Sequence, residues 1–243
     1  MNLLGQTVLI TGGGTGIGYG IAQAFAAEGC RVAIAGRRLD VLKSAAASIS
    51  GETAVQFHEV DVADRASVNR LIAWAEQTLG KIDILVNAAG INTKTRTMGN
   101  LLPEQWDQVL AINATGVYNC LHAALPLMRT QKNGLILNIS STSGKRAAPL
   151  GGVAYNASKF AVTALSTSVA AEEAQHGIRV TTIFPGEVDT PILENRPQPV
   201  SAERRATMLK PSDLGHIAVS IAQLPPHAHV SEIVIKPLEQ EYI

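Results

Sequence analysis

This sequence of 243 residues has no net charge, only two cysteines and no long apolar run. Basic and acidic residues number 20 each, so no net field directs the protein to nucleic acid or to an anionic membrane. No apolar run approaches the roughly 20 residues that a membrane span needs. The first residues also lack the basic and apolar segments of a signal peptide. We therefore expect a soluble, cytoplasmic protein that binds neither nucleic acid nor membrane.

The two cysteines and the histidines give little support for redox or metal chemistry. Cys30 and Cys120 do not form a C-x-x-C pair, and we expect two buried thiols in a reducing compartment. His227 and His229 could form a metal pair, but the Pro-Pro dipeptide beside them favours a surface turn, so we expect no metal site. The zinc-protease motif H-E-x-x-H and the esterase motif G-x-S-x-G are both absent.

What the sequence does contain is a regular alternation of strand and helix patterns. Strands are expected at residues 8–10, 31–36, 54–60, 82–86, 134–139, 179–184 and 232–236. Helices are expected between them, ending near residues 28, 49 and 79, and covering residues 103–129, 153–175 and 212–222. The run at 82–86 is almost continuously apolar, which is typical of a parallel strand buried on both faces. We predict one α/β domain over residues 1–243, with a doubly wound seven-stranded parallel sheet flanked by helices.

Two further features concern surfaces. The helices at 103–129 and 153–175 are too apolar for burial on one side only, so we expect a homodimer or homotetramer. Residues 185–210 contain four prolines and break the alternation. A long irregular stretch inside a compact domain is typical of a binding loop. We therefore expect a substrate lid over residues 187–210, with an apolar surface to which Leu193 contributes.

A glycine-rich loop, Thr11 to Gly18, follows the first strand and opens the first helix. Glycines allow the backbone to approach a pyrophosphate, and the helix N-terminus offers unpaired N–H groups to it. A strict G-x-G-x-x-G is absent, and a glycine turn alone could have no function. Its place after the first strand of an α/β chain nevertheless favours a Rossmann dinucleotide site. The residues expected at that site are Gly12, Gly14, Thr15, Gly16, Ile17 and Gly18.

The end of the second strand discriminates between the two nicotinamide cofactors. An NAD site usually has an acidic residue there to hold the ribose hydroxyls. This sequence has Arg37 and Arg38 instead, and the planar guanidinium pairs well with phosphate. We infer NADP(H), with Arg37 as the main ligand of the 2′-phosphate and Arg38 either a second ligand or a solvated residue; NAD(H) stays possible. Asp61 and Val62 are expected at the adenine, although Asp61 could instead cap the following helix.

Tyr155 and Lys159 are four residues apart and share one face of the helix expected at 153–175. A free tyrosine has a pKa of about 10 and is a poor base near neutrality. A nearby ammonium favours the phenolate, so we expect Lys159 to lower the pKa of Tyr155 by about 1–3 units. The tyrosine could then exchange a proton with a substrate oxygen. On its own this spacing is also typical of an exposed amphipathic pair.

The pattern does not stand alone, because the sequence resembles the short-chain dehydrogenase/reductase family over nearly its whole length. The matching segments occur in the family's order: the Thr11–Gly18 loop, Asp61, Asn87-Ala88-Ala89-Gly90, Asn113, Ser140-Ser141, Tyr155 with Lys159, and Pro185-Gly186 with Thr190. The resemblance implies an oxidoreductase that interconverts a carbonyl and an alcohol of a small molecule. The alternative is a dinucleotide-binding regulatory or scaffold protein without turnover.

The resemblance also implies roles for individual residues. Ser141 would bond the substrate oxygen, and Tyr155 would be the general acid/base. Lys159 would bind the nicotinamide ribose and tune Tyr155, while Asn113 would hold a water that relays protons to solvent. Asn87 would in addition brace the sheet. The other implied cofactor contacts come from Asn87, Ala88, Gly90, Pro185, Gly186, Val188 and Thr190.

Some assignments around the substrate stay open. Ser141 precedes Tyr155 by fourteen residues, one more than in most members, so Ser140, Thr142 and Ser143 are alternatives for the hydroxyl, and Ser143 could also face the substrate. Glu187 could face either substrate or solvent. The cations that follow Ser141, Lys145 and Arg146, could meet a substrate carboxylate or be solvated loop residues.

Overall fold

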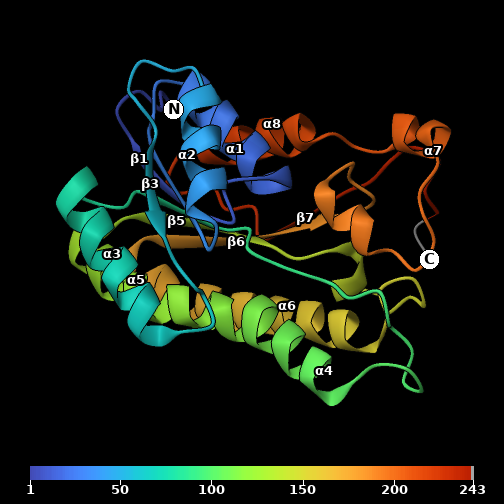
Figure 1. Ribbon diagram of the computed structural model, residues 1–243. Coiled ribbons are helices and arrows are strands. Elements are labelled where there is room, and N and C mark those ends of the chain that lie inside the picture. The colour runs from blue at the N-terminus through green and yellow to red at the C-terminus, as the bar shows by residue number, and fades with distance from the viewer. Residues whose placement is uncertain (242–243) are drawn as a thin grey trace.

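The computed structural model describes residues 1–241 and has a parallel sheet of seven strands at its centre (Figure 1). The strands are β1 (Thr7–Thr11), β2 (Arg31–Gly36), β3 (Gln56–Glu59), β4 (Ile84–Asn87), β5 (Gly134–Ile139), β6 (Ile178–Pro185) and β7 (Glu232–Ile235). Their order is β3-β2-β1-β4-β5-β6-β7, and every pairing between neighbours is parallel. The predicted doubly wound seven-stranded parallel sheet is confirmed.

Helices cover both faces of this sheet, as Figure 1 shows. One face carries α1 (Gly16–Ala27), α2 (Leu39–Ser48) and α8 (Pro211–Ala222), and the other carries α3 (Arg65–Leu79), α5 (Gly116–Gln131) and α6 (Val153–Glu173). Successive residues of β1 point to opposite faces, so Val8 and Ile10 belong to one apolar core and Leu9 to the other. Burial on both sides explains why the strand segments are continuously apolar.

Strand β4 begins two residues later than the pattern predicted, and side chains explain the difference. Both backbone groups of Ile82 bond the side-chain amide of Gln131, in place of a neighbouring strand. The carboxylate of Asp83 accepts bonds from the backbone N–H and the hydroxyl of Thr7, each at 2.9 Å. The apolar run therefore predicts the buried segment correctly, but its first two residues bond side chains of α5 and β1 and do not belong to the strand.

The helical stretch expected at 103–129 is interrupted. It consists of α4 (Pro103–Leu110), a π-helical segment Ala111–Thr115 and α5. The side chain of Asn113, inside the π segment, bonds both backbone groups of Ile91 and the hydroxyl of Ser158. Insertions of this kind inside α-helices are common at functional sites. In this protein the wider π turn, which holds one more residue than an α-helical turn, directs Asn113 toward the loop that follows β4.

The predicted lid is more ordered than a loop. Thr190 is followed by a 3-10 helix, Pro191–Asn195, and then by α7 (Ala202–Thr207). An isolated parallel bridge joins Val188 to Leu209 and closes the segment at its base. Leu193 is buried, as expected for an apolar lid surface.

Both cysteines are buried, as predicted, and burial raises the pKa of each thiol to about 12. The imidazole of His229 bonds the carbonyl of Val180 at 2.8 Å. Within residues 1–241, no helix has both the length and the apolar character required to cross a membrane.

Candidate functional site

Two adjoining cavities lie at the carboxyl ends of the central strands, beside the point between β1 and β4 where the strand order reverses. Ligands of open α/β sheets bind in this crevice. The first cavity, of about 440 Å³, is lined by the glycine loop and the end of β2. The second, of about 220 Å³, is lined by the start of α6, the residues after β5 and the lid. Gly90 lines both, so the two cavities meet at the end of β4.

The glycine loop is built for a close backbone approach. Gly12 has φ +69°, and a Cβ placed there would lie 2.7 Å from the backbone nitrogen of Ala89. A Cβ on Gly18 would lie 2.4 Å from the carbonyl oxygen of Gly12. Gly12, Gly14 and Thr15 line the 440 Å³ cavity. A Cβ at Gly12 or Gly18 would clash with neighbouring backbone, so glycine is needed for the tight turn that lets the loop approach a pyrophosphate, and the residues present fit a dinucleotide.

The residues expected at the adenine end of the dinucleotide line the same cavity. Arg37, Arg38, Asp61 and Val62 all contribute to its wall, and both arginines are exposed there. The capping alternative for Asp61 is wrong, because the side chain of Asp64 accepts the bond from the backbone of Ala66 and caps α3. The carboxylate of Asp61 instead accepts a bond from its own loop, from the Ala63 N–H at 3.0 Å.

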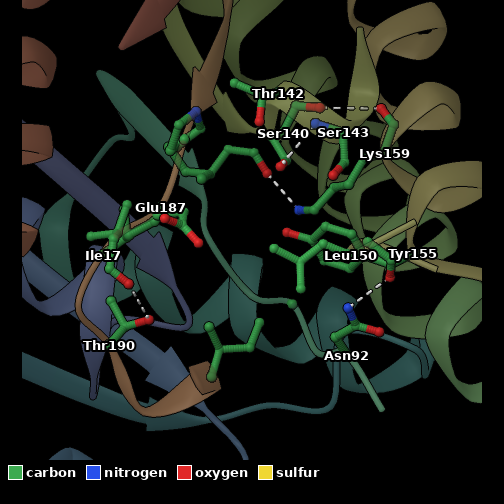
Figure 2. A pocket seen from close by; sticks show the side chains of 18 of the residues that line it. Ile17, Asn92, Ser140, Thr142, Ser143, Leu150, Tyr155, Lys159, Glu187 and Thr190 are labelled. Carbon is green, nitrogen blue, oxygen red and sulfur yellow. Dashed lines mark hydrogen bonds between the residues drawn. The ribbon is translucent and has the colours of Figure 1, made fainter. Parts of the chain in front are cut away.

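The second cavity contains the tyrosine, the lysine and the serine predicted to act together. Figure 2 shows Tyr155 and Lys159 side by side on one wall, with Glu187 and Thr190 on the opposite wall. Ser141 lines the same cavity, and its hydroxyl favours the ionised form of Tyr155. The ammonium of Lys159 lies 5.5 Å from the centre of the Tyr155 ring and donates a 2.8 Å bond to the carbonyl of Ile139.

The expectation that Lys159 would lower the pKa of Tyr155 is wrong for the protein without cofactor. Burial is the largest influence and raises the pKa of Tyr155. The Ser141 hydroxyl and the positive charge of Arg96 oppose this rise without overcoming it. Burial also lowers the pKa of Lys159 to about 8, because desolvation disfavours the ammonium. Desolvation therefore sets the direction of the pKa shift in both groups.

Two predicted asparagines lie beside the cavities and outside their linings. The three hydrogen bonds of the Asn113 side chain hold the Ile91 backbone and the Ser158 hydroxyl, next to Lys159. Asn87 donates a 2.8 Å bond to the Asn138 side chain across β4 and β5, which is the brace expected of it. The Oδ1 atom of Asn87 is buried and has no hydrogen-bond partner among residues 1–241.

Four hydroxyl groups that follow β5 were candidates for the substrate contact, and they differ in orientation. Ser140 donates to the carbonyl of Lys159 at 3.1 Å, so its hydroxyl supports α6. The Ser141 hydroxyl faces Tyr155, despite the additional residue in the following loop. Ser141, Thr142 and Ser143 all line the cavity. The longer loop is accommodated by a 3-10 helix at Thr142–Gly144 and leaves Ser141 in the same cavity wall as Tyr155.

The lid side of the cavity contains the remaining predicted residues. Glu187 lines the cavity, and its carboxylate accepts bonds from Arg196, at 2.7 Å, and from Arg204. Gly16 lies close to the Thr190 side chain, so the start of α1 is next to the lid. Other predicted residues that line this cavity are Ile17, Ala88, Pro185, Gly186, Val188 and Leu193.

Sequence reasoning missed four polar side chains that line the second cavity, namely Asn92, Arg96, Arg196 and Gln240. They come from the loop after β4, the lid and the C-terminal segment, and no motif signals them. Lys145, one of the two cations proposed for a substrate carboxylate, lies elsewhere. Its ammonium pairs with Glu232 and sits 4.7 Å from the centre of the Phe184 ring.

Known proteins resemble the chain over most of its length. A sequence model of the family described as short chain dehydrogenase matches residues 6–200. A glycine betaine reductase of Emericella nidulans is 34% identical over 244 residues, which are 98% of this chain and 19% of that relative. The chain thus spans about a fifth of that protein. An uncharacterized oxidoreductase of Staphylococcus aureus is 32% identical over 236 residues, covering 97% of this chain and 99% of the relative.

Among solved structures, one neighbour is an alcohol dehydrogenase from the archaeon Thermococcus sibiricus, complexed with 5-hydroxy-NADP. It superposes with a TM-score of 0.87 at 27% sequence identity, and the match covers 97% of this chain and 98% of that chain.

Proposed function

Because this chain belongs to the short-chain dehydrogenase/reductase family, and is therefore an oxidoreductase acting on alcohol and carbonyl groups, we propose that it uses NADP(H) and that Tyr155 is its general acid/base. The observation that carries the proposal is that Ser141, Tyr155 and Lys159 line one cavity, with the Lys159 ammonium 5.5 Å from the Tyr155 ring centre, and that this cavity adjoins the glycine-lined one. A regulatory or scaffold protein would need neither this grouping of side chains nor the buried lysine.

The dinucleotide would extend across both cavities. The glycine loop would approach the pyrophosphate, with Arg37 at the 2′-phosphate and Arg38 beside it. Pro185, Gly186 and Thr190 would border the nicotinamide in the second cavity. When bound, the cofactor supplies or accepts the hydride at its nicotinamide ring. The residues of the chain then have to orient the substrate and handle one proton.

Proton handling is assigned to the side chains around the Tyr155 oxygen. In carbonyl reduction the Tyr155 hydroxyl would donate its proton to the substrate oxygen, which Ser141 holds with a hydrogen bond. The raised pKa keeps the phenol protonated in the protein without cofactor, which suits an acid. In the oxidation direction the phenolate would be needed, and the ammonium of Lys159 would stabilise it. Asn113 positions this group, since it fixes the neighbouring Ile91 and Ser158.

Tyr155→Phe tests the proton role. We expect kcat for reduction of an accepted carbonyl to fall by about 10²–10⁴-fold, because a positioned general acid contributes that factor. The dissociation constant for NADPH, measured by fluorescence, should stay within a few-fold of wild type. Equal and low turnover by wild type and Tyr155→Phe, together with tight NADPH binding, would instead identify a binding protein without catalysis.

The cofactor preference has its own test. Arg37→Ala should weaken NADPH binding by about 10–100-fold, the range of a lost hydrogen bond to a charged group, and leave NADH binding unchanged. Arg38→Ala is the matched comparison, because the two arginines are adjacent and both line the cavity. A wild-type enzyme that prefers NADH would overturn the assignment of Arg37.

Assembly and location are also proposals. Tyr118 on α5 and Phe160 on α6 are exposed large side chains, 40% and 42% accessible, on the two helices expected at an interface. We expect them to be covered in a homodimer or homotetramer. Light scattering should give a multiple of the 25.6 kDa chain mass, whereas a single chain mass would remove the claim. The two buried thiols fit a reducing, cytoplasmic location.

A further inference from the structure

Arg96 is a buried cation where the sequence showed only a loop residue. Its residue exposure is 8%, and its guanidinium donates to three backbone carbonyls from separate segments. Nε bonds Thr93 at 2.7 Å, Nη2 bonds Asn195 at 2.8 Å, and Nη1 bonds Leu150. These segments are the loop after β4, the lid and the loop after Ser141, so Arg96 joins the three walls of the second cavity.

The charge of Arg96 has no counter-charge in the part of the chain that the structure describes. No aspartate or glutamate within residues 1–241 forms an ion pair with Arg96, although each neighbouring arginine of the lid has one. Burial, followed by the charge of Arg196, lowers the pKa of Arg96. An arginine does not lose its proton in proteins, so the guanidinium stays charged in surroundings that disfavour the charge. A buried charge is expensive unless it is paired.

The guanidinium also has spare donor capacity. It carries five N–H groups, and three carbonyls are bonded, so two N–H groups are left without an acceptor among the described residues. Arg96 lines the second cavity, and its charge acts on the Tyr155 hydroxyl, so it lies close to the reacting oxygen. The remaining donors are therefore near the place where a substrate would bind.

The cavity as a whole is positively charged. Its described lining includes three cations, Arg96, Lys159 and Arg196, and one carboxylate, Glu187. Glu187 is shared, because it pairs with Arg204 as well as Arg196. The cavity is also small, at about 220 Å³, below the usual size of a site for drug-sized ligands. Such a pocket favours a compact anion over a large or neutral ligand.

We propose that the substrate of this enzyme is a small molecule with an oxyanion, a carboxylate or a phosphate, held by Arg96 with Arg196 beside it. The inference rests on the proposed function, because the anion is bound in order to present a carbonyl or hydroxyl group to Tyr155. A planar guanidinium is suited to an oxyanion, since two N–H groups can donate to two oxygens. Binding would supply the missing counter-charge.

The proposal is tested with pairs of substrates that differ in charge. Wild-type enzyme with NADPH is assayed on acetoacetate against methyl acetoacetate, and on dihydroxyacetone phosphate against dihydroxyacetone. We expect kcat/KM to be at least about 10-fold higher for the anionic member of one pair, and which pair it is distinguishes a carboxylate from a phosphate. Equal or better use of both neutral members overturns the proposal.

Variants then assign the preference to Arg96. Arg96→Gln should lower kcat/KM for the anionic member by about 100-fold and for the neutral member by less than about 5-fold. Arg96→Lys keeps the charge and should retain part of the preference. Arg179→Gln is the matched control, because Arg179 is also partly buried and bonds two carbonyls, of Leu224 and Ala228, away from both cavities. An equal loss on both members by Arg96→Gln would make Arg96 a structural clamp only.

A binding measurement on wild type tests the anion site even if the Arg96 variants do not fold or none of the assayed substrates is turned over. Wild type with saturating NADP⁺ is titrated with acetate, inorganic phosphate or neutral acetamide at constant ionic strength, and binding is followed by calorimetry. Saturable binding of acetate or phosphate, and none of acetamide, supports the anion site. Absence of anion binding overturns it. Because this arm needs no turnover, an inactive protein that binds anions would refute the catalytic proposal and leave the anion site standing.

Discussion

Lys159 should make the cofactor-free protein less stable at neutral pH, although it is central to the proposed chemistry. Burial lowers its pKa from 10.5 to about 8 in the folded protein. Between these two values the unfolded chain holds a proton that the folded chain has released, so stability rises with pH over that window. At one pKa unit per about 1.4 kcal/mol, the free energy of unfolding contributed by Lys159 changes by about 3 kcal/mol from pH 7 to pH 10.5.

The perturbation is Lys159→Met, which keeps the length of the side chain and removes the charge. Fixed differences between the variants, such as the lost bond to the Ile139 carbonyl, shift the two stability curves by a constant. All other titrating groups are shared and cancel in the difference. Relative to the variant, wild type should therefore gain about 3 kcal/mol between pH 7 and pH 10.5, or about 6–12 °C in Tm for a chain of this size.

Urea unfolding of both proteins without cofactor, at half-unit steps from pH 7 to pH 10.5, measures this difference. Lys43→Met, at an exposed lysine of α2, is the matched control for removing a lysine charge. Parallel stability curves for wild type and Lys159→Met would refute the reasoning, because they would mean that burial leaves the ammonium fully hydrated.

Three other substitutions have defined consequences. Glu173→Gln removes the buried partner of Arg129 and should lower the free energy of unfolding by about 1–2 kcal/mol at pH 7. Because Arg129 lowers the pKa of Glu173, this stability is present above pH 4.5 and is lost as the pH falls further. Urea unfolding at pH 7 and pH 4 measures the loss. Gly12→Ala places a Cβ 2.7 Å from the Ala89 nitrogen at φ +69° and should weaken NADPH binding by more than about 100-fold in a fluorescence titration. Asn113→Ala removes three hydrogen bonds and should lower the free energy of unfolding by about 3 kcal/mol in urea.

The sheet could be predicted from the sequence because its signal is local and repeated. Every central strand has to bury both faces, so each one carries a short apolar run, and the crossovers between parallel strands require helices. The glycine loop is readable for a similar reason, since only glycine fits where Gly12 and Gly18 touch neighbouring backbone. The boundaries were less accurate, because side chains such as that of Gln131 replace strand partners at the ends.

The substrate side of the site could be predicted only in part. Tyr155 and Lys159 are four residues apart on one helix, so their proximity follows from helical geometry. Arg96 and Arg196 are a hundred residues apart and meet because the loop after β4 packs against the lid. No periodicity or spacing records a contact between two irregular segments. Sequence proximity left open whether Lys145, which follows Ser141, meets a substrate carboxylate, and in the structure Lys145 pairs with Glu232 instead.

The direction of the Tyr155 pKa shift shows the same limit in energetic terms. The spacing of Tyr155 and Lys159 reveals an attractive charge, whereas burial depends on everything packed around the pair, and burial decides the outcome for both groups. Three groups lie where the parallel strands end: the buried Lys159, and two that lack a partner among residues 1–241, the charge of Arg96 and the Oδ1 of Asn87. Each is unfavourable for folding on its own, so their concentration at one place is expected where ligands supply the missing partners. These groups lower the stability of the fold, and they would gain favourable interactions when a cofactor and an anionic substrate bind.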